Sequence, residues 1–208
     1  MQPKKRKNKV NVEQRQMHII KKAARLFFKK GYAQTTMRDI ARVTKINLGN
    51  LYNYIESKED ILCRIYYMYQ EPFARWIEEE GILKVEDPMI QLKRSLDKVL
   101  DMIHTYGKEI LLMYRETRVL PPKFMKKVLE TEGSLISFFE AILRKGMEKG
   151  LFKITDPFFT ANMLVFQLSL YPLRRWNLKR YSPGEIKEMT IEHILAALVR
   201  EEAFVVDK

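Results

Sequence analysis

Residues 36–55 constrain the fold most strongly, because they predict two short helices joined by a tight turn. The hydroxyl of Thr36 can cap the first helix, and the carboxylate of Asp39 can reach back to the cap amide. Thr44-Lys45-Ile46 leaves about three residues for the turn, after which Asn47 can cap the second helix. The pattern predicts a helix-turn-helix motif, and an ordinary helical hairpin inside a larger helical protein is the alternative.

The second helix of this pair has a composition that packing alone does not explain. Residues 47–58 contain asparagines, tyrosines and a closing lysine, with little aliphatic bulk. A packing helix would be richer in Leu, Ile and Ala. Contacts with phosphates and base edges need hydrogen-bonding side chains and a close approach of the backbone. We therefore interpret this helix as one that touches a nucleic acid.

The positive charge of the chain is concentrated at the same end. The whole chain has a formal net charge of +12, of which +10 falls within residues 1–60. Such a concentration is typical of a module that binds a polyanion. Residues 1–9 form a basic arm that we expect to be disordered when free, and to lie along phosphates or enter a minor groove when bound. A solubilising tail is the alternative for the arm.

The rest of the chain is expected to be helical. Gly and Pro are sparse, at eight each, and no sustained alternation of β-branched and polar residues predicts a sheet. We expect an all-α protein of about nine helices, and a kink near residues 68–71 because Pro72 lies inside a helical pattern. Besides the pair above and a helix opened by Asp156-Pro157, the expected helices cover residues 12–30, 57–80, 88–106, 108–119, 122–149 and 183–203.

The last two of these helices predict self-association. The helix that follows Asp156-Pro157 is apolar nearly all round, and the final helix carries two apolar stripes. Since a helix that is apolar on all sides must be covered on all sides, we expect a second copy of the chain to cover the outer faces in a two-fold dimer. A monomer with an unusually thick core is the alternative. The residues predicted for the interface are Phe158, Val165, Ile191, Ile194, Leu195 and Leu198.

Other classes of protein receive little support. The single cysteine, Cys63, lies among apolar residues, so we expect it to be a small buried side chain. A chain with one cysteine cannot form an internal disulfide, which fits the reducing cytoplasm. No signal peptide is visible, and the longest charge-free stretch, residues 157–173, is short of the ~20 residues that a membrane span needs. The three histidines are far apart, and HExxH, GxSxG, GxGxxG and P-loop motifs are missing. We therefore expect a cytoplasmic protein without a membrane partner, enzymatic activity, cofactor or metal site.

The first third of the chain resembles a known family. Over residues 19–65 the sequence matches the pattern of the TetR-type (tetracycline-repressor-like) transcriptional regulators, with segments that include Gly31-Tyr32, Asp39-Ile40-Ala41 and Ser57-Lys58-Glu59. It departs from the family at Ile55, where Phe is usual, and at Asn47-Leu48, which affects which bases are read. The resemblance implies a DNA-binding domain over residues 1–56 and a ligand-binding and dimerisation domain over residues 57–208, whose last two helices form a four-helix dimer interface.

Site residues follow from the resemblance position by position. It implies phosphate contacts from Thr36, Tyr52, Tyr54 and Lys58. It places Leu48, Gly49 and Asn50 toward the major groove, with Asn47 at the helix start, and Arg38, Arg42 and Lys45 are further candidates. A two-fold dimer implies a palindromic operator in double-stranded DNA. The leading hypothesis is a repressor released by a small-molecule effector, and an architectural DNA-binding protein without an effector is the alternative.

The C-terminal part is similar to one sub-group of the family, the regulators that sense acyl-coenzyme-A esters. Tyr114-Arg115-Glu116 and residues 173–178 carry this similarity. An acyl or aryl tail would fit between apolar helices, and its polyanionic head would need cations. Alternatively, the cations near residue 175 complement the dipole of a helix C-terminus, and His104 is an ordinary core residue. The predicted ligand contacts are His104, Tyr106, Tyr114, Arg115, Phe166, Gln167, Arg174, Arg175 and Trp176.

Overall fold

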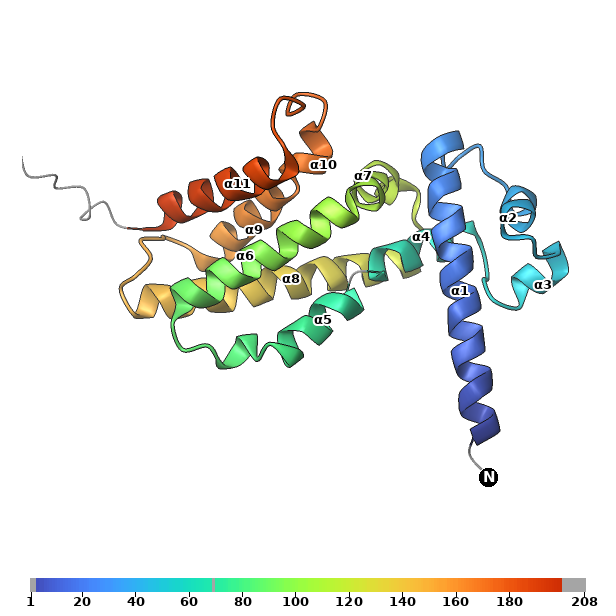
Figure 1. The fold of residues 1–208 in the computed structure, drawn as a ribbon, viewed down its shortest axis with the longest axis horizontal. Coiled ribbons are helices and arrows are strands. Elements are labelled where there is room, and N and C mark those ends of the chain that lie inside the picture. The colour runs from blue at the N-terminus through green and yellow to red at the C-terminus, as the bar shows by residue number, and fades with distance from the viewer. Residues whose placement is uncertain (1–2, 69, 200–208) are drawn as a thin grey trace, which may run out of the picture. The chain divides into compact units, whose positions relative to one another are not determined.

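The computed structural model describes residues 3–68 and 70–199 (Figure 1). Among them every regular element is a helix, apart from one isolated antiparallel bridge between Phe152 and Val199. The predicted all-α class is confirmed. The chain forms two compact units, one made of residues 1–68 and 108–129 and the other of residues 69–107 and 130–208. The division into functional domains at residue 56 stays a prediction.

The first unit is organised around its longest helix. Helix α1 (Pro3–Lys30) packs against α2 (Met37–Thr44) and α4 (Lys58–Tyr67), and the short α3 (Leu48–Tyr52) packs against α2 (Figure 1). The unit also contains most of α7 (Gly107–Glu116), the 3₁₀ helix η2 (Thr117–Val119) and the first turns of α8 (Pro122–Glu148). The residues that fill its core are fully or almost fully buried: Ile19, Ala23, Phe27, Ile40, Leu51, Ile55, Ile61 and Ile65.

The predicted disorder of the basic arm is wrong in this structure, because α1 begins at Pro3 and includes residues 3–9. Proline is tolerated in the first turn of a helix, and no Gly or second Pro interrupts the chain before Gly31. The buried stripe on the later turns of α1 nucleates a helix that then extends through Lys and Arg, which are good helix formers. The helix stops at Gly31, which has a φ of 91°, as the sequence predicts.

The second unit is a bundle. Its elements are α5 (Gln70–Glu79), η1 (Ile82–Lys84), α6 (Pro88–Thr105), most of α8, α9 (Pro157–Leu168), α10 (Leu170–Arg174) and α11 (Pro183–Leu198). Helix α6 packs against α9, α10 and α11. Leu96 and Leu100 of α6 and Leu164 and Leu168 of α9 are almost completely buried. At the edge of this core the ammonium of Lys187 lies 2.7 Å from a carboxylate oxygen of Asp97 and 2.7 Å from one of Asp101, which ties α11 to α6.

Proline explains why the described residues contain more helices than predicted. The helix expected over residues 57–80 is two helices, because α4 ends at Tyr67 and α5 starts at Gln70 with Pro72 in its first turn, where a missing N–H is harmless. The kink expected near residues 68–71 of one continuous helix stays a prediction, because residue 69 lies outside the described residues. Similarly, α10 is separate from α9, since Pro172 in a continuous helix would clash with the carbonyl of Leu168.

The final helix corrects part of the dimer prediction. It ends at Leu198, because Val199 adopts an extended conformation and forms the bridge with Phe152; the predicted remainder of the helix falls outside the described residues. Ile194 and Leu198 are each 3 % exposed within the single protomer, so they are core residues and not interface residues. They share a stripe with Ile186, at the four-residue spacing that places side chains on one helix face.

The described residues also bear on membrane spans and metal sites. No helix described is long and apolar enough to cross a membrane. Within the same residues no group of three or more His, Cys, Asp or Glu side chains could hold a metal ion. Cys63 is buried in the first unit, which fits its interpretation as a small core residue.

Candidate DNA-binding surface

The start of α2 is fixed by a capping box. The backbone N–H of Asp39 donates to Oγ1 of Thr36 at 3.2 Å, and the N–H of Thr36 donates to Oδ2 of Asp39 at 3.0 Å. The ammonium of Lys30 donates to the same carboxylate oxygen at 2.6 Å. These hydrogen bonds, that of Lys30 first among them, hold the pKa of Asp39 well below its usual range. The end of α1 is thereby joined to the start of α2.

The turn between α2 and α3 depends on one left-handed residue. Lys45 has a φ of 58°, and its N–H donates to the carbonyls of Ala41 and Arg42. Asn47 then caps α3, because its side-chain oxygen accepts the N–H of Asn50 at 2.8 Å. The predicted caps of both helices are present, and the turn holds α3 against α2 with its outer side in solvent.

Helix α3 and the residues that flank it include six of the eleven residues that the sequence suggests for base and phosphate contacts. Leu51 points inward and is fully buried, whereas Tyr52 is 51 % exposed. Asn47, Gly49 and Asn50 are exposed, and Leu48 and Tyr54 are partly exposed. A Cβ atom added to Gly49 would meet only the side-chain oxygen of Asn47, at 3.7 Å. Nothing inside the protein therefore requires glycine there, and the missing side chain leaves room for a close approach by another molecule.

Cations surround this face. Arg38, Arg42 and Lys45 are exposed, and the side chain of Arg42 retains 79 % of its accessible surface even though it lies 3.6 Å from Asp39. Because α2 and α3 are joined by a short turn, these cations lie within the same motif as the outer side of α3. An array of exposed cations beside a hydrogen-bonding helix suits a phosphate backbone flanking a groove.

Lys58 lies differently from the other predicted phosphate contacts. Its ammonium donates to the carbonyl of Tyr32 at 2.9 Å and to that of Ala33 at 3.4 Å, and lies 4.3 Å from the centre of the Tyr32 ring. The hydroxyl of Tyr32 donates to Glu59 at 3.0 Å. Burial, together with the Glu59 carboxylate, raises the pKa of Tyr32 above its usual value. Lys58 thus holds α4 to the loop after α1, which leaves at most one N–H for a phosphate.

Sequence reasoning missed the contacts that support this motif. Lys30 reaches Asp39 across the loop, and the side-chain amide of Gln16 on α1 donates to the carbonyl of Tyr54 at 3.0 Å. Both contacts join residues from different elements, whereas capping and helical periodicity describe residues within one element. No sequence pattern identifies them, because they depend on how α1 packs across the pair.

The predicted ligand residues divide between the two units. Tyr114 and Arg115 belong to the first unit and are exposed. The other predicted contacts belong to the second unit, where Phe166 and Trp176 are 59 % and 63 % exposed. These two aromatic side chains lie on the surface of the protomer, and their contact with a ligand stays a prediction. Arg174 stacks its guanidinium 5.3 Å from the centre of the Trp176 ring, and Arg175 is also exposed.

His104 and Gln167 of that set are partly exposed, but each has one buried polar atom. Nε2 of His104 and Oε1 of Gln167 are buried without a hydrogen-bond partner. The His104 ring packs edge-on against Tyr171 with the ring centres 4.8 Å apart, and Tyr106 follows the end of α6, partly exposed. A buried polar atom without a partner is unfavourable by about 1–3 kcal/mol, so each is a candidate to receive a hydrogen bond from a bound molecule.

Comparisons with known proteins decide the family. The family model described as "Bacterial regulatory proteins, tetR family" matches residues 19–65, which contain the helix-turn-helix motif. A second model, described as "Tetracyclin repressor-like, C-terminal domain", matches residues 73–176. The chain belongs to the TetR family of transcriptional regulators. This TetR-family chain is accordingly a helix-turn-helix regulator of transcription, a class without enzymatic activity, and the family binds operator DNA.

Individual relatives agree with this assignment. The TetR-family chain is 25% identical over 182 residues to the HTH-type transcriptional regulator HbdR of Aromatoleum sp. (strain CIB), covering 85% of this chain and 77% of the relative. The crystal structure of the regulator PfmR from Thermus thermophilus matches with a TM-score of 0.73 and 26% identity, covering 88% and 99% of the two chains. AibR in complex with isovaleryl coenzyme A and operator DNA matches with a TM-score of 0.72 and 19% identity, covering 86% and 97%, and shares the fold.

Proposed function

We propose that this regulator is a ligand-responsive repressor that binds a palindromic operator as a homodimer and is released by a small-molecule effector. The observation that carries the proposal is the outer side of α3, where the position of Gly49 is open and flanked by exposed Asn50 and Tyr52. Such a surface lets the backbone of α3 approach a groove closely.

The contacts with DNA divide by chemistry. Leu48, Gly49 and Asn50 face the major groove in this proposal, and Asn47 stands at the start of the helix that enters it. Thr36, Tyr52, Tyr54 and the exposed cations Arg38, Arg42 and Lys45 bind phosphates, with Lys58 in a supporting position. Phosphate contacts set affinity and register, whereas the groove-facing side chains select the sequence.

Self-association follows from an uncovered apolar face on α9. Phe158, Phe159, Met163 and Phe166 are between 45 % and 65 % exposed, and Met189 of α11 is 40 % exposed. A contiguous apolar face of this kind is typical of an interaction site, and a second copy of the same face would cover it. The proposed interface therefore keeps Phe158, Val165, Ile191 and Leu195, gains the exposed residues named above, and loses Ile194 and Leu198.

The effector is proposed to be an acyl- or aryl-coenzyme-A ester. His104 and Gln167 offer buried polar atoms that need a partner, beside apolar helices that suit a tail. Arg174 and Arg175, next to Trp176, offer cations and an aromatic face for a polyanionic head. The complex of AibR, a protein of the same fold, with isovaleryl coenzyme A supports this class of ligand.

Release from DNA is explained by linkage. The effector is proposed to bind better to a conformation in which the two recognition helices no longer match successive major grooves, about 34–36 Å apart. Linkage is reciprocal, so saturating operator must weaken effector binding by the same factor by which effector weakens operator binding.

Selection of bound duplexes from a random pool tests the proposal. The expected product is a palindrome whose half-sites lie about one helical turn apart. Isovaleryl coenzyme A is then titrated into the protein–duplex complex, and a fall in operator affinity is expected. Enrichment of a single asymmetric half-site would contradict the dimer. Operator affinity unchanged across a series of acyl-coenzyme-A esters would favour an architectural protein without such an effector.

A further inference from the structure

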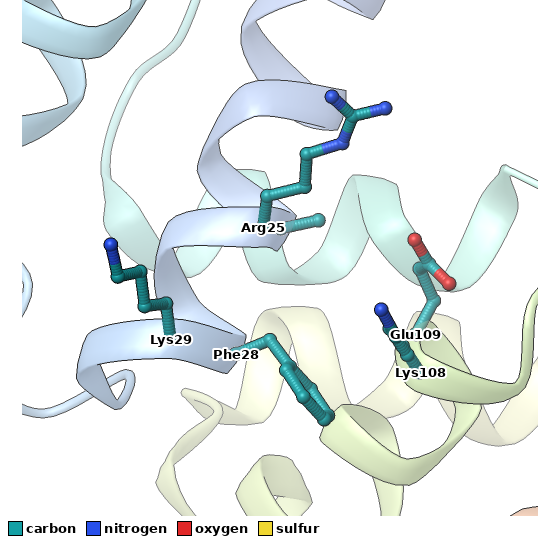
Figure 2. A pocket seen from close by; sticks show the side chains of 6 residues that line it. Arg25, Phe28, Lys29, Lys108 and Glu109 are labelled. Atoms are coloured by element: carbon teal, nitrogen blue, oxygen red, sulfur yellow. The ribbon is translucent and has the colours of Figure 1, made fainter.

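A hollow of about 220 Å³ in the first unit has no role in the function proposed above. It lies between the last turns of α1 and the first turn of α7 (Figure 2). Its lining consists of Ala24, Arg25, Phe28, Lys29, Lys108 and Glu109. Ala24 is buried, whereas the Phe28 ring is 44 % exposed and extends from α1 toward α7 (Figure 2).

The charges around the hollow favour an anion. Three cations and one carboxylate line it, which leaves a net charge of +2. Among the residues that the structure describes, no carboxylate forms an ion pair with Arg25, Lys29 or Lys108. The first turn of α7 contributes the positive end of its dipole in addition. Three cations that share one hollow with a single carboxylate leave an excess of positive charge, and a bound anion would reduce the repulsion among them.

The Phe28 ring suggests that a ligand of this hollow also has an apolar part. The Lys108 ammonium lies 5.7 Å from the centre of the Phe28 ring, so a cation and an apolar surface adjoin in the hollow. A cavity of about 150 Å³ holds benzene, and drug-sized ligands need about 300 Å³ or more. A space of about 220 Å³ therefore fits a molecule slightly larger than one aromatic ring.

We propose that this hollow is a binding site for a small aromatic or short-chain carboxylate. The carboxylate lies against Arg25 and Lys108, and the apolar part lies on Phe28 and Ala24. Glu109 weakens the attraction, because its carboxylate repels the ligand. The site lies within one unit and shares no residue with the proposed effector site, so it does not depend on the identity of that effector.

The probe is 4-fluorobenzoate, whose binding to the full chain is followed by fluorine NMR. Acetate, which has the charge without the ring, and 4-fluorobenzyl alcohol, which has the ring without the charge, serve as comparison ligands. We expect both to bind at least about tenfold more weakly than 4-fluorobenzoate. A tenfold loss of affinity corresponds to one lost charge-assisted hydrogen bond, or to the loss of a similar free energy of apolar contact.

Matched variants test the lining directly. The double substitution Arg25→Gln with Lys108→Gln is expected to weaken 4-fluorobenzoate binding about tenfold or more. Lys21→Gln with Lys22→Gln removes two exposed cations of α1 outside the hollow and is expected to change binding less than about twofold. Glu109→Gln is expected to strengthen binding. Retained operator binding shows that each variant is folded.

Three results would contradict the proposed site. The two double variants could lose affinity for 4-fluorobenzoate equally, or 4-fluorobenzyl alcohol could bind as tightly as 4-fluorobenzoate. The third is weaker binding of 4-fluorobenzoate by the Glu109→Gln variant. None of them bears on the DNA-binding proposal, because the lining residues lie outside the proposed DNA and effector contacts. Failure of the hollow and failure of the repressor proposal are therefore separate outcomes.

Discussion

At the scale of single residues, Gly49 and Lys58 show how position decides role. A Cβ atom on Gly49 would meet only Oδ1 of Asn47, at 3.7 Å, whereas the Lys58 ammonium already contacts two carbonyls and the Tyr32 ring. The sequence identifies both as members of the DNA-binding pattern. It cannot separate a residue that touches DNA from one that supports the motif, because the contacts of Lys58 with Tyr32 and Ala33 arise only when the loop after α1 folds over the start of α4.

Replacing Gly49 with Ala should leave the fold intact and impair binding. Ala is favoured over Gly in a helix by about 0.5–1 kcal/mol, so we expect an equal or higher free energy of unfolding. The added methyl group would hold α3 away from the groove, and operator affinity should fall about tenfold or more. Fluorescence anisotropy measures the affinity. Gly133→Ala, in α8 and free of neighbours within 4 Å, is the control. Unchanged affinity for Gly49→Ala would remove Gly49 from the interface.

Arg42 and Lys58 should respond differently to substitution. Arg42→Gln removes an exposed cation, so binding to all duplexes should weaken and the salt slope should fall by about one. Lys58→Met should lower the free energy of unfolding by about 1 kcal/mol, because it removes partly exposed hydrogen bonds, and should change the salt slope less. Denaturant unfolding and affinity at several salt concentrations measure the two effects. Equal salt slopes in the two variants would contradict the supporting position of Lys58.

At the scale of elements, local signals predict most helix ends in this chain. The Thr36 cap, the Gly31 stop and the Asp156-Pro157 start each depend on residues within about one turn, and each is present. The burial of Ile194 is not predictable from such signals, since two apolar stripes of α11 look alike until α6 and α9 cover one of them. The helical conformation of residues 3–9 was also missed. Composition indicates the charge of this arm, but it does not show that the helix over the following residues continues into it.

Packing between α8 and the segment that follows predicts opposite effects on stability when two glycines of α8 are replaced by alanine. A Cβ atom on Gly146 would overlap the buried ring of Phe152, whereas one on Gly133 of the same helix meets nothing within 4 Å. Gly146→Ala should lower the free energy of unfolding by about 1–3 kcal/mol. Gly133→Ala should raise it by about 0.5–1 kcal/mol. Chemical denaturation compares them, and a stabilised Gly146→Ala variant would show that Phe152 does not pack there.

The partly buried His104 of α6 predicts a dependence of stability on pH. Burial lowers the pKa of His104 below its ordinary value of 6.5, an effect larger than the opposing one of Asp101. The folded chain then binds this proton less readily than the unfolded chain, so the free energy of unfolding should fall as the pH falls below 6.5. The substitution His104→Gln should flatten this change in thermal unfolding between about pH 7 and pH 5. The exposed His193→Gln is the control, and equal pH profiles for wild type and His104→Gln would refute the assignment.

At the scale of the whole molecule, α9 presents an outer face that one protomer does not cover. Phe159→Glu should convert the proposed dimer into a monomer, because a carboxylate on the apolar face would be buried without a partner. The core substitution Ile194→Ala should lower the free energy of unfolding by about 2–5 kcal/mol, with the surface face intact. Sedimentation and denaturation distinguish the two effects. A Phe159→Glu variant that remains dimeric would place the interface elsewhere.

The most direct measurement of the central claim is the mass of the complex between the protein and a selected operator duplex, determined by sedimentation near physiological salt. We expect two protomers on one palindromic duplex. Scrambling either half-site should abolish this two-protomer complex. One protomer bound to an intact palindrome, or binding that is indifferent to scrambling, would contradict this expectation.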